Sequence, residues 1–401
     1  MSHDVGTVEQ QDFESRARAV GSALATSLGA VVDALPNPTS RPAPLVAALG
    51  VNRDIAGRTL ATIRAADPLV ALHGAPGPEP LRKFIRAAAQ HDVPTGVLDA
   101  AEQAIARFES LIRNEAGDRR ALDAIICDRT PALRDKYEQS ARHGIFRGVS
   151  ELKGVQADLN LTTAILTPAA DGTMLDAVWV IGLLGTCRLR PNVPVKMGAR
   201  RMVLDADDDS SVQSLSDVNL DQYCVNTPAR LASHRTDDVM IYTLDEQSVG
   251  RRAVVDLLAA HRHAGILERY RASTPRHMES VFADIAVPVR AVVLDVFMHP
   301  DVFPGAEPTV VMHDTGVDGL AHINDPRRDF DQMPVREPVE VLGTGIARAH
   351  CDELPTYPDL LQRVASANDW DINTYRGYRI RMSYPMYGSQ IHMAFQPPLR
   401  D

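Results

Sequence analysis

The sequence predicts a multidomain α+β protein with an all-α N-terminal half and an α+β C-terminal half built mainly of antiparallel sheet. Apolar residues recur every three or four positions as far as about residue 153, which is typical of amphipathic helices. After residue 154, short runs rich in β-branched residues alternate with turn residues, which is typical of strands. The 401 residues are enough for two or three domains.

Residues 1–36 are predicted to form one long helix, from about residue 8 to residue 35, and a proline-rich linker beginning at Pro36 ends it. Its apolar residues make a narrow stripe on one helical face: Phe13, Ala17, Val20, Leu24, Leu28, Val31 and Leu35. The stripe either packs on its own domain or forms a coiled-coil seam with a second copy of the chain.

Residues 41–78 contain two short helical patterns separated by a glycine, within the segment PAPLVAALGVNRDIAGRTLATIRAADPL. Gly50 lies where the first helix must stop and the chain must bend, and glycine tolerates the left-handed conformation of such a bend. Asn52 is a suitable N-cap for the second helix. The apolar and small residues fit the positions that pack two helices across a tight turn, so we predict a helix-turn-helix.

This segment resembles the helix-turn-helix of bacterial one-component transcriptional regulators of the IclR and GntR types, over about residues 42–66. The resemblance is carried by Leu49-Gly50-Val51 and by the run from Ile55 to Ile63. It implies binding of double-stranded DNA by a recognition helix at about residues 52–64. It also implies a homodimer, because paired half-sites usually match a two-fold symmetric protein.

The outward positions of the second helix are polar or small, which suits the major groove. Arginine pairs with guanine edges or phosphates and asparagine with adenine, so the expected DNA contacts are Asn52, Arg53, Arg58 and Arg64. The segment from Arg41 to Arg86 holds seven basic and three acidic residues, a local excess of +4 in a chain of net charge −10. Leu69–His73 could give one strand of a wing, but Pro76 and Pro78 leave little room for a partner strand, so we expect no full wing.

Residues 79–153 are predicted to form a helical linker domain of four helices. Their apolar patterns begin near residues 81, 97, 122 and 133.

Residues 154–401 are predicted to form an α+β domain that senses a small-molecule effector or binds a partner. Strands are expected at residues 159–166, 178–184, 239–244, 287–298 and 309–312. Helices are expected at residues 248–271 and 357–367. Strict alternation at residues 378–384 and 391–395 predicts a final β-hairpin.

A second basic cluster could bind an anionic ligand, or could instead be a solvated loop facing the acidic run at residues 205–209. The cluster comprises Arg188, Arg190, Lys196, Arg200 and Arg201.

No P-loop, nucleophile elbow or HExxH motif occurs, and no cofactor is expected. Histidine and aspartate do concentrate at residues 299–351, where His299, His313 and His322 are weak metal-ligand candidates. Gly343 and Gly345 are better explained by a strand bulge or turn than by a nucleotide loop. A metal-dependent enzyme and a helical interaction scaffold that does not bind DNA therefore remain as alternatives.

The lack of a secretory signal and of a long apolar run predicts a cytoplasmic protein. The N-terminus lacks the basic and apolar regions of a secretory signal, and no apolar run approaches the length of a membrane helix. The four cysteines, Cys127, Cys187, Cys224 and Cys351, are far apart, which favours reduced thiols over a disulfide framework.

Overall fold

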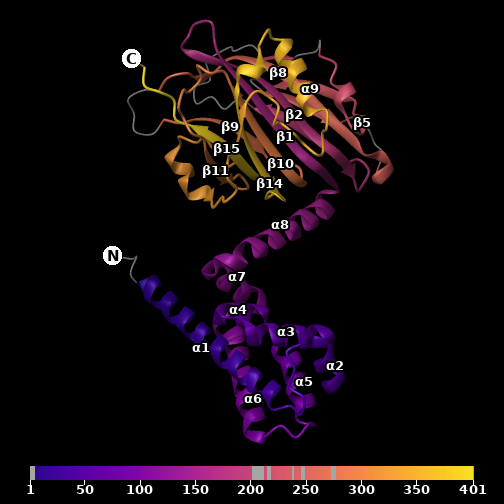
Figure 1. The fold of residues 1–401 in the computed structure, drawn as a ribbon. Helices are drawn as coiled ribbons and strands as arrows, with labels where there is room; N and C mark the ends of the chain where they lie inside the picture. The colour runs from indigo at the N-terminus through magenta and orange to yellow at the C-terminus, as the bar shows by residue number, and fades with distance from the viewer. Residues whose placement is uncertain are drawn as a thin grey trace. The chain divides into compact units, whose positions relative to one another are not determined.

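The structure is a computed structural model that describes residues 5–200, 212–214, 218–236, 239–244, 249–271 and 277–400. It has two compact units, Met1–Glu138 and Gln139–Asp401. Helices make up the first unit and sheets dominate the second, which confirms the α+β class (Figure 1).

The first unit is helical throughout its described residues, and α8 continues across the unit boundary. The helices are α1 (Val5–Asp33), α2 (Pro42–Leu49), α3 (Arg53–Arg64), α4 (Pro68–Gly74), α5 (Pro78–Ala88), α6 (Thr95–Ser110), a π-helical turn (Leu111–Ala116), α7 (Arg119–Arg129) and α8 (Pro131–Lys153). The helices predicted from about residue 8 to residue 35 and from near residue 133 are confirmed as α1 and α8.

One hydrophobic core holds α1 to the other helices of the first unit. The α1 residues Ala17, Leu24 and Leu28 are fully buried in it, together with Leu45 of α2 and Leu81 of α5. The apolar stripe of α1 therefore packs on its own unit. A second copy of the chain would have to contact another surface.

The strand that residues 69–73 could have supplied to a wing does not form, because these residues belong to α4. Asp67 caps this helix, since its side chain accepts a hydrogen bond from the backbone N–H of Leu69 at 2.8 Å. Pro68 occupies the first turn, where its fixed φ suits a helix start.

The second unit is built on a large sheet in the order β13-β14-β10-β1-β2-β8-β4, with β5 also paired to β8. Its strands are β1 (Val155–Pro168), β2 (Met174–Arg188), β4 (Val212–Ser214), β5 (Thr227–Pro228), β8 (Val255–Glu268), β10 (Val289–Met298), β13 (Glu340–Thr344) and β14 (Arg376–Ser383). The β1–β10 and β5–β8 pairs are parallel and the other described pairs are antiparallel, as expected for a mainly antiparallel sheet.

Two smaller antiparallel sheets complete the unit, in the orders β12-β11-β15-β9 and β3-β7-β6. Their strands are β3 (Lys196–Arg200), β6 (Leu231–Thr236), β7 (Val239–Leu244), β9 (Glu279–Asp284), β11 (Thr309–Asp314), β12 (Gln332–Met333) and β15 (Ser389–Phe395). Short 3-10 helices occur at Asp221–Tyr223, Arg251–Ala253, Pro326–Asp331 and Ile372–Thr374.

The large sheet is the middle layer, with a separate apolar cluster on each face. On one face, β10 residues such as Val292 and Leu294 pack with Val281 of β9 and Met393 of β15. On the other face, α9 (Tyr357–Ser366) supplies buried residues that include Leu360. The helix predicted at residues 357–367 is thus confirmed.

The predicted hairpin at the C-terminal end is wrong, although both of its strands exist. β14 pairs with β10 and β13 in the large sheet, whereas β15 pairs with β11 and β9 in the four-stranded sheet. Tyr384, with φ of +49°, begins the connection, and Gly388 ends it at φ of +77°. This connection carries the chain from one layer to the next instead of folding it back within one sheet.

The helix predicted at residues 248–271 is also wrong, because β8 occupies Val255–Glu268. The strand lies between β2 and β4, and its first seven residues are buried whichever face they point to. A strand buried on both faces loses the polar alternation that marks a half-exposed strand. Its leucine and alanine content then favours a helix by propensity alone.

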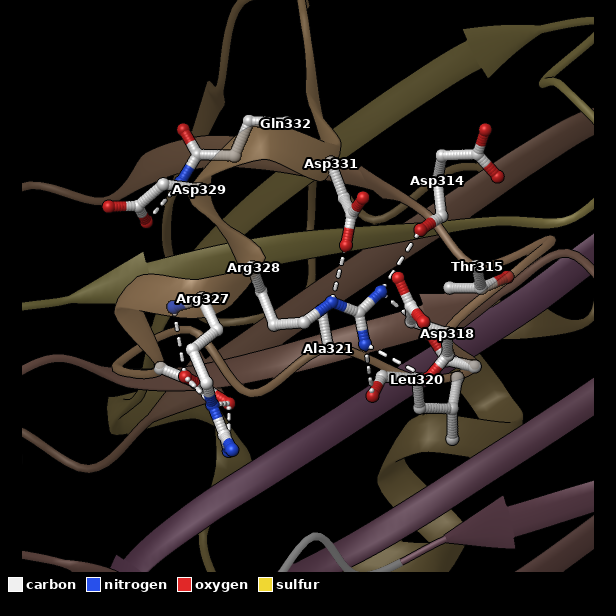
Figure 2. A network of polar contacts seen from close by, with 12 residues as sticks. Asp314, Thr315, Asp318, Leu320, Ala321, Arg327, Arg328, Asp329, Asp331 and Gln332 are labelled. Carbon is white, nitrogen blue, oxygen red and sulfur yellow. Dashed lines mark hydrogen bonds and ion pairs between the residues drawn. The ribbon is translucent and has the colours of Figure 1, made fainter.

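A long connection after β11 is fixed by one buried arginine (Figure 2). Arg328 donates hydrogen bonds to the carbonyl oxygens of Asp314, Asp318, Gly319 and Leu320 at 2.9–3.2 Å. Its Nε also pairs with the Asp331 carboxylate at 2.5 Å. One side chain thereby satisfies backbone carbonyls from the end of β11 to Leu320.

Candidate functional site

The turn between α2 and α3 has the geometry that the sequence predicts. Gly50 caps α2 in the left-handed conformation at φ of +63°, and its N–H binds the carbonyl oxygen of Val46 at 2.9 Å. Asn52 caps α3, because its Oδ1 accepts a hydrogen bond from the N–H of Asp54 at 2.8 Å. Two short helices therefore meet across a defined three-residue turn.

The two faces of α3 differ sharply. Ala56, Thr59, Leu60 and Thr62 are buried against the first unit's core. The outward residues are exposed, namely Asn52, Arg53, Asp54, Arg58, Ala61 and Arg64. The outward face is thus polar and cationic, with one acidic side chain near its N-terminus.

Asn52 is partly used by the fold. Reading adenine requires both the oxygen and the nitrogen of the amide, and Oδ1 is already an acceptor for the helix cap. The Nδ2 group still has donors for a phosphate.

Arg58 differs more strongly from its expected role as a free DNA contact. Its Nε donates to the carbonyl oxygen of Gly74 at 3.1 Å, and its Nη2 donates to that of Ala75 at 2.7 Å. These carbonyls lie at the C-terminal end of α4, where a cation is favourable. Arg58 therefore ties α3 to α4.

Arg53 and Arg64 are exposed at the two ends of α3, and neither has an ionic or side-chain hydrogen-bond partner in the parts of the chain that the structure describes. Nearby basic residues are less available. Arg82 pairs with Glu102 at 2.8 Å and Glu109 at 2.5 Å, and the α6 glutamates offset part of the local positive excess.

A shallow groove of about 510 Å³ lies beside the C-terminal end of α3. Small side chains of α1, such as Ala25 and Gly29, form one wall, and Ile63 and Ala66 form the other. Asp33 is its one charged lining residue. The groove is concave but offers few groups that could orient a ligand.

The predicted anion cluster is not assembled by the described residues. Arg188 is buried and donates to the carbonyl oxygens of Val193 at 2.9 Å and Leu244 at 3.1 Å. Arg190 donates to the carbonyl oxygen of Leu152. The side chains of Lys196 and Arg200 lie outside the described residues, as do Arg201 and the acidic run at 205–209. The two described arginines thus bind backbone carbonyls.

The three histidine candidates lie in separate settings. His299 accepts a hydrogen bond from the N–H of Asp301 and lies edge-on to Tyr375. His313 is buried with its ring 5.1 Å from that of His392. His322 accepts a hydrogen bond from the N–H of Asn324, and burial lowers its pKa. None of the three belongs to a metal-ligand group among the described residues.

A different group of ligand-type side chains was missed by the sequence analysis. The group comprises Glu268 at the end of β8, His277, and Glu279 at the start of β9. Their ligand atoms all lie within 4.8 Å of one another. His277 Nε2 lies 3.4 Å from Glu268 Oε2 and 3.2 Å from Glu279 Oε1. His277 and Glu279 are two residues apart at the start of a strand, so their side chains point to the same side, and this spacing was a usable signal. Glu268 could not be added to it, because it lay in the helix wrongly predicted at residues 248–271.

Other polar groups of the second unit serve its fold, and the clearest of them surrounds Asp295. Asp295 is fully buried and accepts two hydrogen bonds from Arg379, at 2.8 and 2.7 Å, and one from the Tyr357 hydroxyl at 2.8 Å. Gly343 lies at a register shift between β13 and β14, as the bulge prediction requires. All four cysteines are free, and burial raises the pKa of the Cys351 thiol to about 11. A thiol with such a pKa is a poor nucleophile.

No protein-family model, curated protein or solved structure matches the chain. Among the described residues, no helix combines the length and the apolar character needed to cross a membrane. Function is therefore inferred from the chain's own residues.

Proposed function

We propose that the chain is a DNA-binding transcriptional regulator that acts in the cytoplasm. Its recognition helix is α3, and its second unit senses an effector or a partner. The observation that carries the proposal is the outward face of α3, where Arg53 and Arg64 are exposed and lack partners among the described residues. Exposed cations at both ends of a helix suit contacts with phosphates and base edges of the major groove.

The local geometry supports this proposal in two ways. Capping by Gly50 and Asn52 fixes the helices without using the outward face of α3 beyond Asn52 Oδ1. Arg58 locks α3 to α4, so the arginines on the outward face are presented by a fixed scaffold. A preorganised surface loses less conformational entropy on binding than a mobile one.

We further propose that the regulator binds DNA as a homodimer, since helix-turn-helix proteins commonly match paired half-sites. The α1 stripe is used inside the first unit, so the dimer contact uses another surface. Light scattering of the purified chain, alone and with DNA, measures the stoichiometry. A monomer in both conditions would contradict this part of the proposal.

The decisive experiment is selection of genomic DNA fragments by the purified chain at physiological salt, beside the Arg53→Ala/Arg64→Ala double variant. We expect selective enrichment by the wild type and its loss in the variant. Binding should also become less salt-dependent, by about one unit of log–log slope for each phosphate contact removed.

The matched control is the Arg107→Ala/Arg120→Ala double variant. It removes the same charge from exposed positions on α6 and α7, where neither arginine forms an ion pair with another described residue. Equal loss of binding in both double variants would show a general charge effect and would contradict α3 as the reader. Arg58 is left intact because its removal would disturb the α3–α4 contact.

A further inference from the structure

We propose that Glu268, His277 and Glu279 bind one zinc ion, with a fourth coordination position open to water or a ligand. This site is independent of the proposed DNA binding. One imidazole and two carboxylates are ligands that zinc accepts, and three protein ligands with an open position are typical of exchangeable zinc sites.

Two of the three separations between ligand atoms agree with tetrahedral coordination, and the third, between the two carboxylates, is at most 4.8 Å. With metal–ligand bonds of about 2.0–2.1 Å, two tetrahedral ligands lie about 3.3 Å apart. His277 Nε2 lies 3.4 Å from one carboxylate oxygen and 3.2 Å from the other. A metal ion that replaced the two direct contacts of His277 would therefore leave these two separations nearly unchanged.

The positions of the ligands are fixed by the surrounding backbone. Met278, between His277 and Glu279, is held at both polar groups by the Asn324 amide: its N–H donates to Oδ1 at 2.9 Å, and its carbonyl accepts from Nδ2 at 2.8 Å. Glu268 ends β8, which belongs to the large sheet. Ligands held on two sheets in this way are preorganised for an ion.

The charge of the group also favours a divalent cation. His277 and Glu279 are only 16% and 15% exposed, whereas Glu268 is 54% exposed and gives access from solvent. One protonated histidine can neutralise only one of the two carboxylates. A divalent ion would balance both carboxylates and remove this unfavourable burial of charge.

The test is calorimetric titration of the chelator-treated full chain with Zn²⁺, together with Co²⁺ absorption as a report on coordination geometry. We expect one ion per chain, with affinity that falls in acid because metal ligands must be deprotonated. His277→Ala and Glu279→Gln should each weaken binding by about tenfold or more. Glu279→Gln preserves shape and tests the ligand even if His277→Ala perturbs folding.

The matched control is His350→Ala, which removes an exposed histidine outside the group. Its zinc binding should equal that of the wild type. Absence of stoichiometric binding, or binding unchanged in both His277→Ala and Glu279→Gln, would overturn the proposal. Either result would identify the group as an ion-paired triad in which His277 alone bridges the carboxylates.

Discussion

The two units differ in whether charged side chains are buried in their interiors. In the first unit, the buried polar residues among those described are Thr59, Thr62 and Thr130, and the ion pairs lie at least partly in solvent. In the second unit, Asp256, Asp295 and several other charged or histidine side chains are buried. The first unit is therefore held mainly by apolar packing and helix caps. The second also depends on buried hydrogen-bond networks, each of which must be complete.

This difference can be measured separately in each unit. Both tryptophans, Trp179 and Trp370, belong to the second unit, so their fluorescence follows its unfolding alone. Most helices belong to the first unit, so far-UV circular dichroism mainly follows that unit.

The largest effect is expected from breaking the buried pair in the second unit. Arg379→Met leaves the fully buried Asp295 without its cation, and such unpaired buried charges cost about 3–5 kcal/mol. Urea unfolding followed by tryptophan fluorescence measures the loss. The Asp295→Leu/Arg379→Met double variant should recover part of it. A loss below about 1 kcal/mol in the single variant would contradict the importance assigned to this network.

The same difference explains what the sequence could predict. Helices of the first unit follow from local periodicity, and the Gly50 and Asn52 caps follow from residue type at a local position. In the second unit, the strands near residues 159–166 and 178–184 were predicted, but the pairing of β14 and β15 was not. Pairing depends on which layer each strand enters, and alternation within one strand carries no such information.

The candidate sites follow the same rule. The exposure of Arg53 and Arg64 was predictable because helix periodicity places them outward. The bonds of Arg58 to the end of α4 were not predictable, because the sequence analysis expects no helix at residues 68–74. Similarly, Glu268 meets His277 only because the large sheet and the four-stranded sheet pack together.

In the first unit, the largest effect should come from overpacking rather than from charge. A Cβ atom at Gly21 of α1 would lie 2.1 Å from the carbonyl oxygen of Pro68, so Gly21→Ala must push α1 and α4 apart. We expect a loss of about 1–3 kcal/mol in urea unfolding followed by circular dichroism.

Gly29→Ala is the matched control on the same helix. Its Cβ would meet Ile63 at 3.5 Å, an ordinary contact, so the higher helix propensity of alanine should leave stability unchanged or raise it by up to about 1 kcal/mol. Equal losses in the two variants would show that the α1–α4 contact is not as close as described.

Acid should destabilise the second unit through its buried histidines. Burial, and then the neighbouring His313 and His322, lowers the pKa of His392 to about 3. The unfolded chain binds a proton near pH 6.5, whereas the folded chain does not. The contribution of His392 to stability is therefore complete above pH 6.5 and falls below it by about 1.4 kcal/mol per pH unit.

His392→Gln isolates this effect. Glu279 acts in the opposite direction. Burial, and then repulsion from Glu268, raises its pKa to about 8, so the folded state binds a proton that the unfolded state lacks. The measurement is therefore the difference between wild type and His392→Gln in urea unfolding at pH 7 and pH 5.5. The wild type should lose more stability than the variant over this interval, and parallel behaviour would contradict the assignment.

The smallest effect on stability concerns Asn52. This residue also connects the fold of the first unit with its proposed function. Asn52→Ala removes the side-chain cap of α3 and should cost about 1 kcal/mol, whereas Asn52→Asp keeps an oxygen in the capping position and should cost much less. If α3 meets DNA phosphates, the added negative charge should still weaken DNA binding in Asn52→Asp. Unfolding followed by circular dichroism and DNA binding at two salt concentrations separate the two properties. Unchanged DNA binding in the stable Asn52→Asp variant would remove the N-terminal end of α3 from the interface and leave Arg64 as the residue to test.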